Sequence, residues 1–287
     1  MPRLSEYEIR VTGEFRAMPQ LDCFSTEIDR RHRLPIYLNL SEVTFMRPLA
    51  VVGTIIFLET MISRGRTIRF HWPRRHGVLN YLVGIGLPSA LDDLRQWHWP
   101  DDFPREPVRR LKPMIKLTKL ASTADVERVA GEMIDIFQTD MTGYASLLQP
   151  CHLVFSELAD NSLAHSGSHA YVLAQKFEYP HGTMIDITVG DGGVGVSRSL
   201  AENPAYRSRL SSNEWALSLA LQDGVSVTGD PSRGFGLGHV KGELAAPGRS
   251  LIMRSSGELA YRTQGRAPIF RECGASVGTL VHSQIPC

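Results

Sequence analysis

The sequence predicts an α+β protein built in two parts. Strand-like and helical segments alternate in the first part, whereas the second opens with two helices and continues with a strand hairpin and further strand-like segments. A proline-rich stretch lies between these patterns, and proline disfavours both helices and central strands. For a chain of 287 residues we therefore expect an N-terminal domain over residues 1–98, a linker over residues 99–113 and a C-terminal domain over residues 114–287.

The N-terminal part contains apolar runs of alternating type. Residues 36–40 and 67–71 have the pattern of strands, and residues 49–63 and 78–84 have the pattern of helices. Gly65 is placed to end the first of these helices and to start the turn that follows. The predicted order of elements is β-α-β-α.

The C-terminal part begins with a helix signal. Ser122 and Asp125 have the spacing of a capping box, and apolar residues follow at helical spacing. Residues 179–182 have the composition of a hairpin turn, and Gly224 is placed to end a later helix. Further helices are expected over residues 149–165 and 213–221, and strands over residues 170–177, 184–189, 250–254, 258–263 and 278–285. Helices on one side of a mostly antiparallel sheet make a two-layer α/β sandwich.

The composition excludes several classes of protein. Apolar residues make up 43% and charged residues 21%, as in an ordinary globular protein with a core. A net charge of +1 argues against a nucleic acid partner. The longest apolar run, residues 49–58, is about half the length that a bilayer requires, and residues 1–10 lack the apolar core of a signal peptide. We expect no membrane span.

The cysteines are widely spread and have no paired C-x-x-C spacing. They are Cys23, Cys151, Cys273 and Cys287. Neither a zinc knuckle nor a disulfide framework is indicated, so we expect reduced thiols and a cytoplasmic location.

The first motif that carries chemistry lies on the second predicted helix of the C-terminal part. Glu157, Asn161 and His165 follow one another at four-residue steps, and Asp160 falls beside them on the same face. The opposite face carries Cys151, Phe155, Leu158, Ala159 and Ser162. Such a helix can pack one side on a sheet and present polar groups to a cleft. The alternative for this helix alone is a solvated polar face.

The second motif, residues 190–195, follows a predicted strand and reads Gly-Asp-Gly-Gly-Val-Gly. It satisfies the G-x-G-x-x-G pattern of dinucleotide-binding folds. That interpretation fails because the Asp191 carboxylate would face a pyrophosphate, and because the preceding strand pairs in a hairpin and not through a parallel crossover. A simple turn residue is the remaining alternative for Asp191.

The third motif comprises Gly234, Phe235, Gly236, Leu237 and Gly238. It precedes a helix that we expect to start near His239, so its backbone N–H groups could receive phosphate oxygens. A plain glycine hinge is the alternative. Residues 196–233 would form a lid over the site, with Arg233 as a candidate phosphate contact.

The order and residue types of these motifs, together with Gly278-Thr279 before the last strand, resemble the GHKL ATPase superfamily. This superfamily includes DNA gyrase, the heat-shock chaperone ATPases, histidine kinases and the MutL mismatch-repair proteins. The resemblance covers most of the second half of the chain and implies a site for ATP and Mg²⁺. No G-x-x-x-x-G-K-[ST] loop offers a rival ATP site.

The resemblance also implies roles for individual residues. In the family, the matching asparagine holds the magnesium ion and the matching glutamate orients or deprotonates the nucleophile, which assigns these roles to Asn161 and Glu157. Asp191 would accept a hydrogen bond from the adenine amino group. The other residues assigned to ATP binding are Gly193 and Gly195 near the base, Gly234, Gly236, Leu237 and Gly238 near the phosphates, and Thr279 near the adenine.

Residues 34–87 resemble the STAS domain of anti-sigma factor antagonists, by their pattern of elements and by the segment Val43-Thr44-Phe45-Met46. The phosphoacceptor segment of that family aligns with Arg47-Pro48-Leu49-Ala50, which has no hydroxyl. A STAS-like domain of this kind would keep a docking surface for a protein partner and lose the phosphorylation switch.

Two classes of function remain. The first is an enzyme in which Glu157 activates water for ATP hydrolysis, or activates a serine or threonine hydroxyl on a protein partner. The alternative is an ATP-gated interaction module without physiologically relevant turnover. The partners expected are ATP or ADP, a protein bound through the STAS-like domain and, as a further option, a second copy of the chain in a homodimer.

Overall fold

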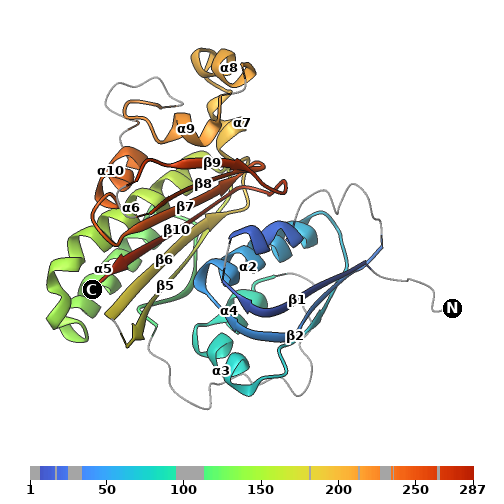
Figure 1. Cartoon of the computed structure of the whole chain (residues 1–287). Coiled ribbons are helices and arrows are strands. Elements are labelled where there is room, and N and C mark those ends of the chain that lie inside the picture. The colour runs from blue at the N-terminus through green and yellow to red at the C-terminus, as the bar shows by residue number, and fades with distance from the viewer. Residues whose placement is uncertain are drawn as a thin grey trace.

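The computed structural model describes residues 7–16, 18–24, 34–94, 113–180, 182–212, 214–226, 234, 236–263 and 266–287. It contains two sheets: a parallel sheet of three strands in the order β1-β2-β3, and a sheet of seven strands in the order β4-β5-β6-β10-β7-β8-β9 (Figure 1). Every pair of neighbouring strands in the larger sheet is antiparallel. The predicted α+β class is confirmed. The predicted linker, residues 99–113, lies outside the described residues except for Pro113.

The N-terminal region contains the predicted strands and helices and three elements that were not predicted. Its elements are β1 (Tyr7–Phe15), the 3-10 helix η1 (Met18–Phe24), β2 (Ile36–Met46), α2 (Pro48–Ser63), β3 (Ile68–His71), α3 (His76–Gly84) and α4 (Leu87–Asp92). Strand β1 pairs in parallel with β2, and its buried residues Ile9, Val11 and Phe15 lie on one side of the strand.

The C-terminal region adds edge strands to the predicted elements. Its elements are β4 (Ile115–Leu120), α5 (Thr123–Thr139), the 3-10 helix η2 (Thr142–Leu147), α6 (Leu148–His165), β5 (Ala170–Tyr179), β6 (Gly182–Asp191), α7 (Val196–Leu200), α8 (Pro204–Ser211), α9 (Ala216–Ala220), α10 (Gly236–Glu243), β7 (Ser250–Ser255), β8 (Glu258–Thr263), β9 (Ile269–Glu272) and β10 (Thr279–Pro286). Strands β4 and β9, at the two edges, were not predicted.

The starts of α5 and α9 show how far residues close in the sequence determine where a helix begins. The capping box of α5 is confirmed, because the Asp125 N–H donates to Ser122 Oγ at 3.3 Å and the Ser122 N–H donates to Asp125 Oδ2 at 3.1 Å. The helix predicted over residues 213–221 is shorter, because the Glu258 carboxylate accepts from the N–H groups of Ala216 and Leu217 and caps α9 at that point.

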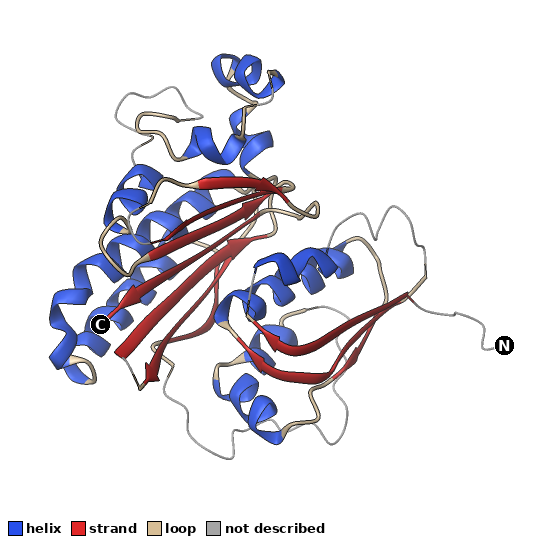
Figure 2. Ribbon diagram, viewed as in Figure 1, coloured by secondary structure: helices blue, strands red, loops and turns tan. Residues whose placement is uncertain are grey.

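Helices α5 and α6 cover one face of the seven-stranded sheet, as predicted (Figure 2). Their buried residues share an apolar core with alternate residues of the central strands. The strand residues of this core include Val172, Ile185, Ile187, Val189, Val281 and Ile285. Because side chains alternate along a strand, the residues between them point to the other face.

Helix α2 covers that other face, between the two sheets (Figure 1). Tyr171, Leu173 and Leu280 of the larger sheet belong to the same core as the N-terminal strands and α2. The reason lies in the sequence of α2, which has apolar residues all round and therefore needs cover on two sides. Within the described part of the chain, no helix is long and apolar enough to cross a membrane.

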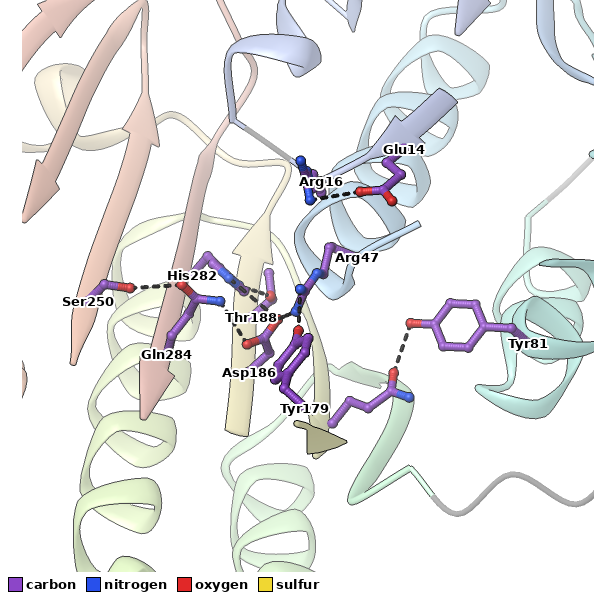
Figure 3. Close-up of polar contacts among 11 residues, drawn as sticks. Glu14, Arg16, Arg47, Tyr81, Tyr179, Asp186, Thr188, Ser250, His282 and Gln284 are labelled. Carbon is purple, nitrogen blue, oxygen red and sulfur yellow. Dashed lines mark hydrogen bonds and ion pairs between the residues drawn. The ribbon is translucent and has the colours of Figure 1, made fainter. Parts of the chain in front are cut away.

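A buried polar network joins the start of α2 to this face of the sheet (Figure 3). Arg47 Nη1 lies 3.0 Å from Asp186 Oδ2, and the same guanidinium donates to the Tyr179 hydroxyl. Gln284 Nε2 donates to Asp186 Oδ1 at 3.0 Å, and His282 Nε2 lies 3.8 Å from Asp186 Oδ2. The side chain of Asp186 is fully buried. Its charge is therefore paired by a residue from the N-terminal region.

Candidate functional site

The candidate site is a cleft of about 690 Å³ on the α6 side of the larger sheet. Such a volume is typical of a site for a small molecule. Eight of the predicted residues line it, drawn from α6, the end of β6, α10 and the start of β10. They are Glu157, Asn161, Asp191, Gly195, Gly234, Gly236, Leu237 and Thr279. The structure therefore brings the three motifs together around one space.

Asp191, at the end of β6, lies on the wall of the cleft. Its residue is only 3% exposed, and its Oδ1 accepts the Gly193 N–H at 2.9 Å. Burial raises the pKa of Asp191 to about 6, against the lowering effect of hydrogen bonds from the N–H groups of Gly193 and Thr279 and from the Ser162 hydroxyl. A buried carboxylate without a cation bound to it is a strong acceptor for a ligand donor.

Ser162 was not among the predicted site residues. The sequence placed it on the buried face of the helix, but it lines the cleft and donates to Asp191. The rest of that prediction is confirmed, since Cys151, Phe155, Leu158 and Ala159 are buried in the core under α6. Ser162 follows Asn161 directly, so the polar face of the helix is wider than the four-residue steps indicated.

Glu157 and Asn161 line the same cleft, beside the start of α10. Glu157 Oε1 is 3.3 Å from His239 Nδ1. Asn161 Nδ2 is buried and has no hydrogen-bond partner among the described residues. A Cβ on Gly236 would lie 3.2 Å from this atom, so glycine at the start of α10 leaves room for the Asn161 amide.

Asp160, also on the wall of the cleft, adds a second carboxylate near Glu157. Burial, and then the charge of Glu157, raise the pKa of Asp160 above its ordinary value. Two carboxylates on adjacent turns repel each other, and a bound cation or hydrogen-bond donor would relieve the repulsion.

The glycines of the third motif make room for this arrangement. A Cβ on Gly236 would overlap the Glu157 carboxylate, and a Cβ on Gly238 would overlap Asp223. Gly234 has a φ of +91°, and a Cβ there would lie 2.6 Å from the Val225 carbonyl oxygen. The prediction that the motif precedes its helix is wrong, because α10 begins at Gly236. The unpaired N–H groups of its first turn therefore come from the motif itself.

Two of the predicted glycines do not line the cleft. Gly193 packs on the Ser166 carbonyl, which a Cβ would overlap, so its role is in the packing of the turn and not in a passage for a ligand. Gly238 lies behind the cleft against Asp223. Gly195 does line it, with a φ of +77° that favours glycine, and a Cβ there would lie 3.0 Å from Ser255 Oγ.

Thr279 connects the cleft to the sheet. It pairs with Asp191 across the β6–β10 ladder, and its Oγ1 lies 3.1 Å from Ser255 Oγ. The Ser255 hydroxyl also receives the Val196 N–H at 2.9 Å. These hydroxyls hold together the first residue of β10, the last residue of β7 and the start of α7, beside Asp191.

The predicted lid comprises α7, α8 and α9 and carries a small apolar core of its own. This core contains Leu200, Ala216, Leu219 and Ala220. Residues 227–233, including the candidate phosphate contact Arg233, and Phe235 lie outside the described residues.

A metal site made only of protein ligands does not fit this region. Among the described residues, no three His, Cys, Asp or Glu side chains are grouped to hold a metal ion. His165 lines the cleft, whereas His169 turns to Glu59 of α2, with 2.6 Å between Nε2 and Oε2. A magnesium ion that takes one amide oxygen from Asn161 and its other ligands from phosphates and water does fit the residues present.

Comparison with known proteins adds no relative. The chain matches no family model, and no curated protein matches it.

Proposed function

We propose that the chain binds ATP with Mg²⁺ in this cleft and acts as a GHKL-type ATPase or protein serine/threonine kinase, with an N-terminal STAS-like region. One observation carries the proposal: a single cleft is lined by a buried carboxylate, a second acid, an amide whose nitrogen has no partner among the described residues, and a glycine-rich helix start. Adenine needs an acceptor for its amino group, and phosphates need N–H donors and a cation.

Asp191 and apolar residues of the cleft suit the base. Above a pH of about 6 the Asp191 carboxylate is ionised and accepts hydrogen bonds only. Leu158, Met253 and Val281 line the same cleft and offer apolar surface for a flat ring. A buried acceptor of this kind rewards a ligand that brings an N–H donor and penalises one that does not.

The region around Glu157, Asn161 and the start of α10 suits the phosphates and the chemistry. ATP would supply the phosphoryl group there, and Asn161 would hold the cation that neutralises it. Glu157 lies beside the helix start of α10, where a nucleophile could reach both the acid and the phosphate end. In the proposed reaction Glu157 takes the proton of a water molecule or of a serine or threonine hydroxyl. His239 Nδ1, 3.3 Å away, can orient the Glu157 carboxylate.

The binding test is titration calorimetry of the full chain with Mg-ADP. We expect binding by the wild type and a loss of about 1–3 kcal/mol in Asp191→Asn, because the amide would turn a donor or a weaker acceptor to the adenine. Asp135→Asn, an exposed change on α5 outside the cleft, is the matched control and should bind normally. Equal affinity of Asp191→Asn and wild type would contradict the adenine assignment.

The chemical test uses Glu157→Ala. Because Asp191, Asn161 and the glycines remain, we expect ADP affinity within a few fold of wild type, and turnover lower by about 100-fold or more through loss of the base. Phosphate release and transfer of labelled phosphate to a protein partner measure the two forms of the reaction. Glu157→Gln, which keeps the shape of the side chain, should show the same loss and excludes a packing effect.

The second candidate is an ATP-gated interaction module. It is favoured by the lid helices over the cleft and by the packing of α2 against the same sheet, since both could relay occupancy of the cleft to a protein surface. In that case the wild type and Glu157→Ala would show no turnover with any partner and would bind ADP equally.

A further inference from the structure

The C-terminal half of α2 lies directly behind the turn that carries Asp191. Ile56 Cδ1 is 2.8 Å from the place that a Cβ would take on Gly190, and Thr60 Oγ1 is 3.5 Å from the same place on Gly192. Glycine at these positions allows the helix to approach the backbone of the turn closely. The N-terminal region therefore supports the turn from behind, although none of its described residues lines the cleft.

A charged contact at the same level ties α2 to the segment before β5. Glu59 Oε2 lies 2.6 Å from His169 Nε2, and Glu59 Oε1 lies 3.5 Å from Lys119 Nζ on β4. The side chains of Glu59 and His169 are each 23% exposed. Burial alone would raise the pKa of Glu59, but His169 and then Lys119 outweigh it and hold the pKa below its ordinary value.

His169 belongs to a short segment, residues 166–169, that contacts the Asp191 turn. The Ser166 carbonyl accepts the Val194 N–H at 3.2 Å, and Gly193 packs on Ser166. The Ser168 N–H donates to Ser166 Oγ at 2.9 Å, which keeps the segment compact. The Gly193 N–H in turn donates to the Asp191 carboxylate. The contacts therefore run without a gap from Glu59 to the carboxylate.

We propose that Glu59 is a positioning residue for the nucleotide site: through His169 it fixes residues 166–169, and through them the turn that presents Asp191 to the ligand. The inference rests on the proposed function. It couples the docking of α2 thermodynamically to the binding of nucleotide, because a contact that stabilises the ordered turn stabilises both. The N-terminal region then acts on the site from within the chain.

The register of the sheet supports this role. Ala170, the residue after His169, pairs with Asp191 across the β5–β6 ladder. A shift of His169 would therefore move the strand residue opposite Asp191. The charge of His169 also acts on Asp191 directly, where it opposes the effect of burial on the pKa of that carboxyl. Both effects act on the acceptor, whereas Glu157 and Asn161 lie further back on α6.

The experiment measures Mg-ADP affinity by calorimetry on four full-length proteins: wild type, Glu59→Ala, Glu59→Gln and Tyr81→Phe. We expect Glu59→Ala to weaken binding by about 3- to 30-fold, the range of a transmitted coupling. Glu59→Gln keeps an oxygen that can accept from His169 and should recover most of the affinity. Tyr81→Phe removes a different polar contact of the N-terminal region, the 2.8 Å hydrogen bond from Tyr81 on α3 to Gln175 on β5. This variant should bind Mg-ADP as the wild type does.

Hydrogen exchange gives a second readout. If the coupling is reciprocal, Mg-ADP should slow exchange in α2 and residues 166–169 of the wild type, and should do so less in Glu59→Ala. Wild-type affinity in Glu59→Ala, or an equal loss in Tyr81→Phe, would overturn the inference and leave the nucleotide site standing. Absence of ADP binding by the wild type would overturn both.

Discussion

Strand β6 carries two buried aspartates that point to opposite faces of the sheet. Asp186 faces α2, is fully buried and is paired by the Arg47 guanidinium. Asp191 faces the cleft and is almost as buried, and its hydrogen-bond donors among the described residues, Gly193, Thr279 and Ser162, are neutral. Burial outweighs them and raises the pKa of Asp191 to about 6. A buried charge that is paired within the chain serves the structure, whereas a buried charge without a cation stores energy that a ligand can release.

The two faces of the seven-stranded sheet also differ in chemistry. The face toward α5 and α6 is aliphatic and adapts to any apolar cover of the right volume. The face toward α2 holds Asp186, Thr188 and His282, and Thr188 Oγ1 lies 2.8 Å from His282 Nδ1. Polar groups in a low-dielectric interior need partners at fixed positions, so this face accepts α2 in one position only.

The largest expected effect is at the paired aspartate. Arg47→Ala leaves Asp186 buried without its cation, and we expect a loss of about 3–5 kcal/mol in the free energy of unfolding, measured by urea denaturation. Arg128→Ala is the control, because its 2.7 Å ion pair with Glu132 is exposed and should contribute at most about 1 kcal/mol. A loss below about 1 kcal/mol in Arg47→Ala would mean that water or a rearrangement replaces the pair.

A smaller effect of opposite sign is expected at the unpaired aspartate. Between a pH of about 4 and about 6 the folded protein binds a proton at Asp191 more readily than the unfolded chain does, so this residue makes the free energy of unfolding fall as the pH rises through that window. Well above pH 6 the folded protein bears the whole free-energy cost of burying the ionised Asp191 carboxylate. Asp191→Asn removes it and should stabilise the protein by about 1–3 kcal/mol at pH 7.5, although it weakens ADP binding.

The pH dependence of that gain separates charge from packing. As the pH falls toward about 4, the difference between Asp191→Asn and wild type should shrink, because the wild-type carboxyl is then neutral in the folded state as well. A gain that is the same at pH 7.5 and pH 4.5 in urea denaturation would show that the amide packs better and that charge is not the reason.

The smallest effect is expected on the aliphatic face. Ile187→Val removes one methylene from the core under α5 and α6 and should cost about 0.5–1.5 kcal/mol. Because the Ile187 side chain lies in the core on the α6 side and does not line the cleft, Mg-ADP affinity should not change. A clear loss of ADP affinity would mean that the core under α6 and the site are coupled, and that the two faces differ less than their chemistry indicates.

Much of this architecture could be predicted because its signals are local. The capping box of α5, the β5–β6 hairpin and the spacing of Glu157 and Asn161 each depend on residues close together in the sequence. The motifs around Glu157, Asp191 and Gly236 are local in the same way and identified eight residues that line the cleft, but they missed Ser162 and included Gly193 and Gly238, which do not line it. Strand β1 also had a local signal in its alternating residues, which the interpretation of the sequence missed.

The remaining features depend on partners far along the chain. Asp186 in a strand looks like a solvent-facing residue until Arg47, on a segment of the N-terminal region, is placed against it. Glu258 of β8 caps α9 and so sets where it begins, and the close approach of Glu157 requires glycine at position 236, the first residue of α10. Helical and strand periodicity carry no information on such pairs.

The cover that α2 provides bears on how this chain could be divided or recombined. A fragment that begins at Pro113 would expose Tyr171, Leu173 and Leu280 to water and would leave Asp186 with no guanidinium. Such a fragment would associate through its bare sheet face, and the N-terminal region alone would present an equally bare α2. The boundary between the two halves is therefore a poor site for a fusion junction or for an exchange of domains. A substitution on one side of the contact between α2 and the sheet calls for a matching substitution on the other side.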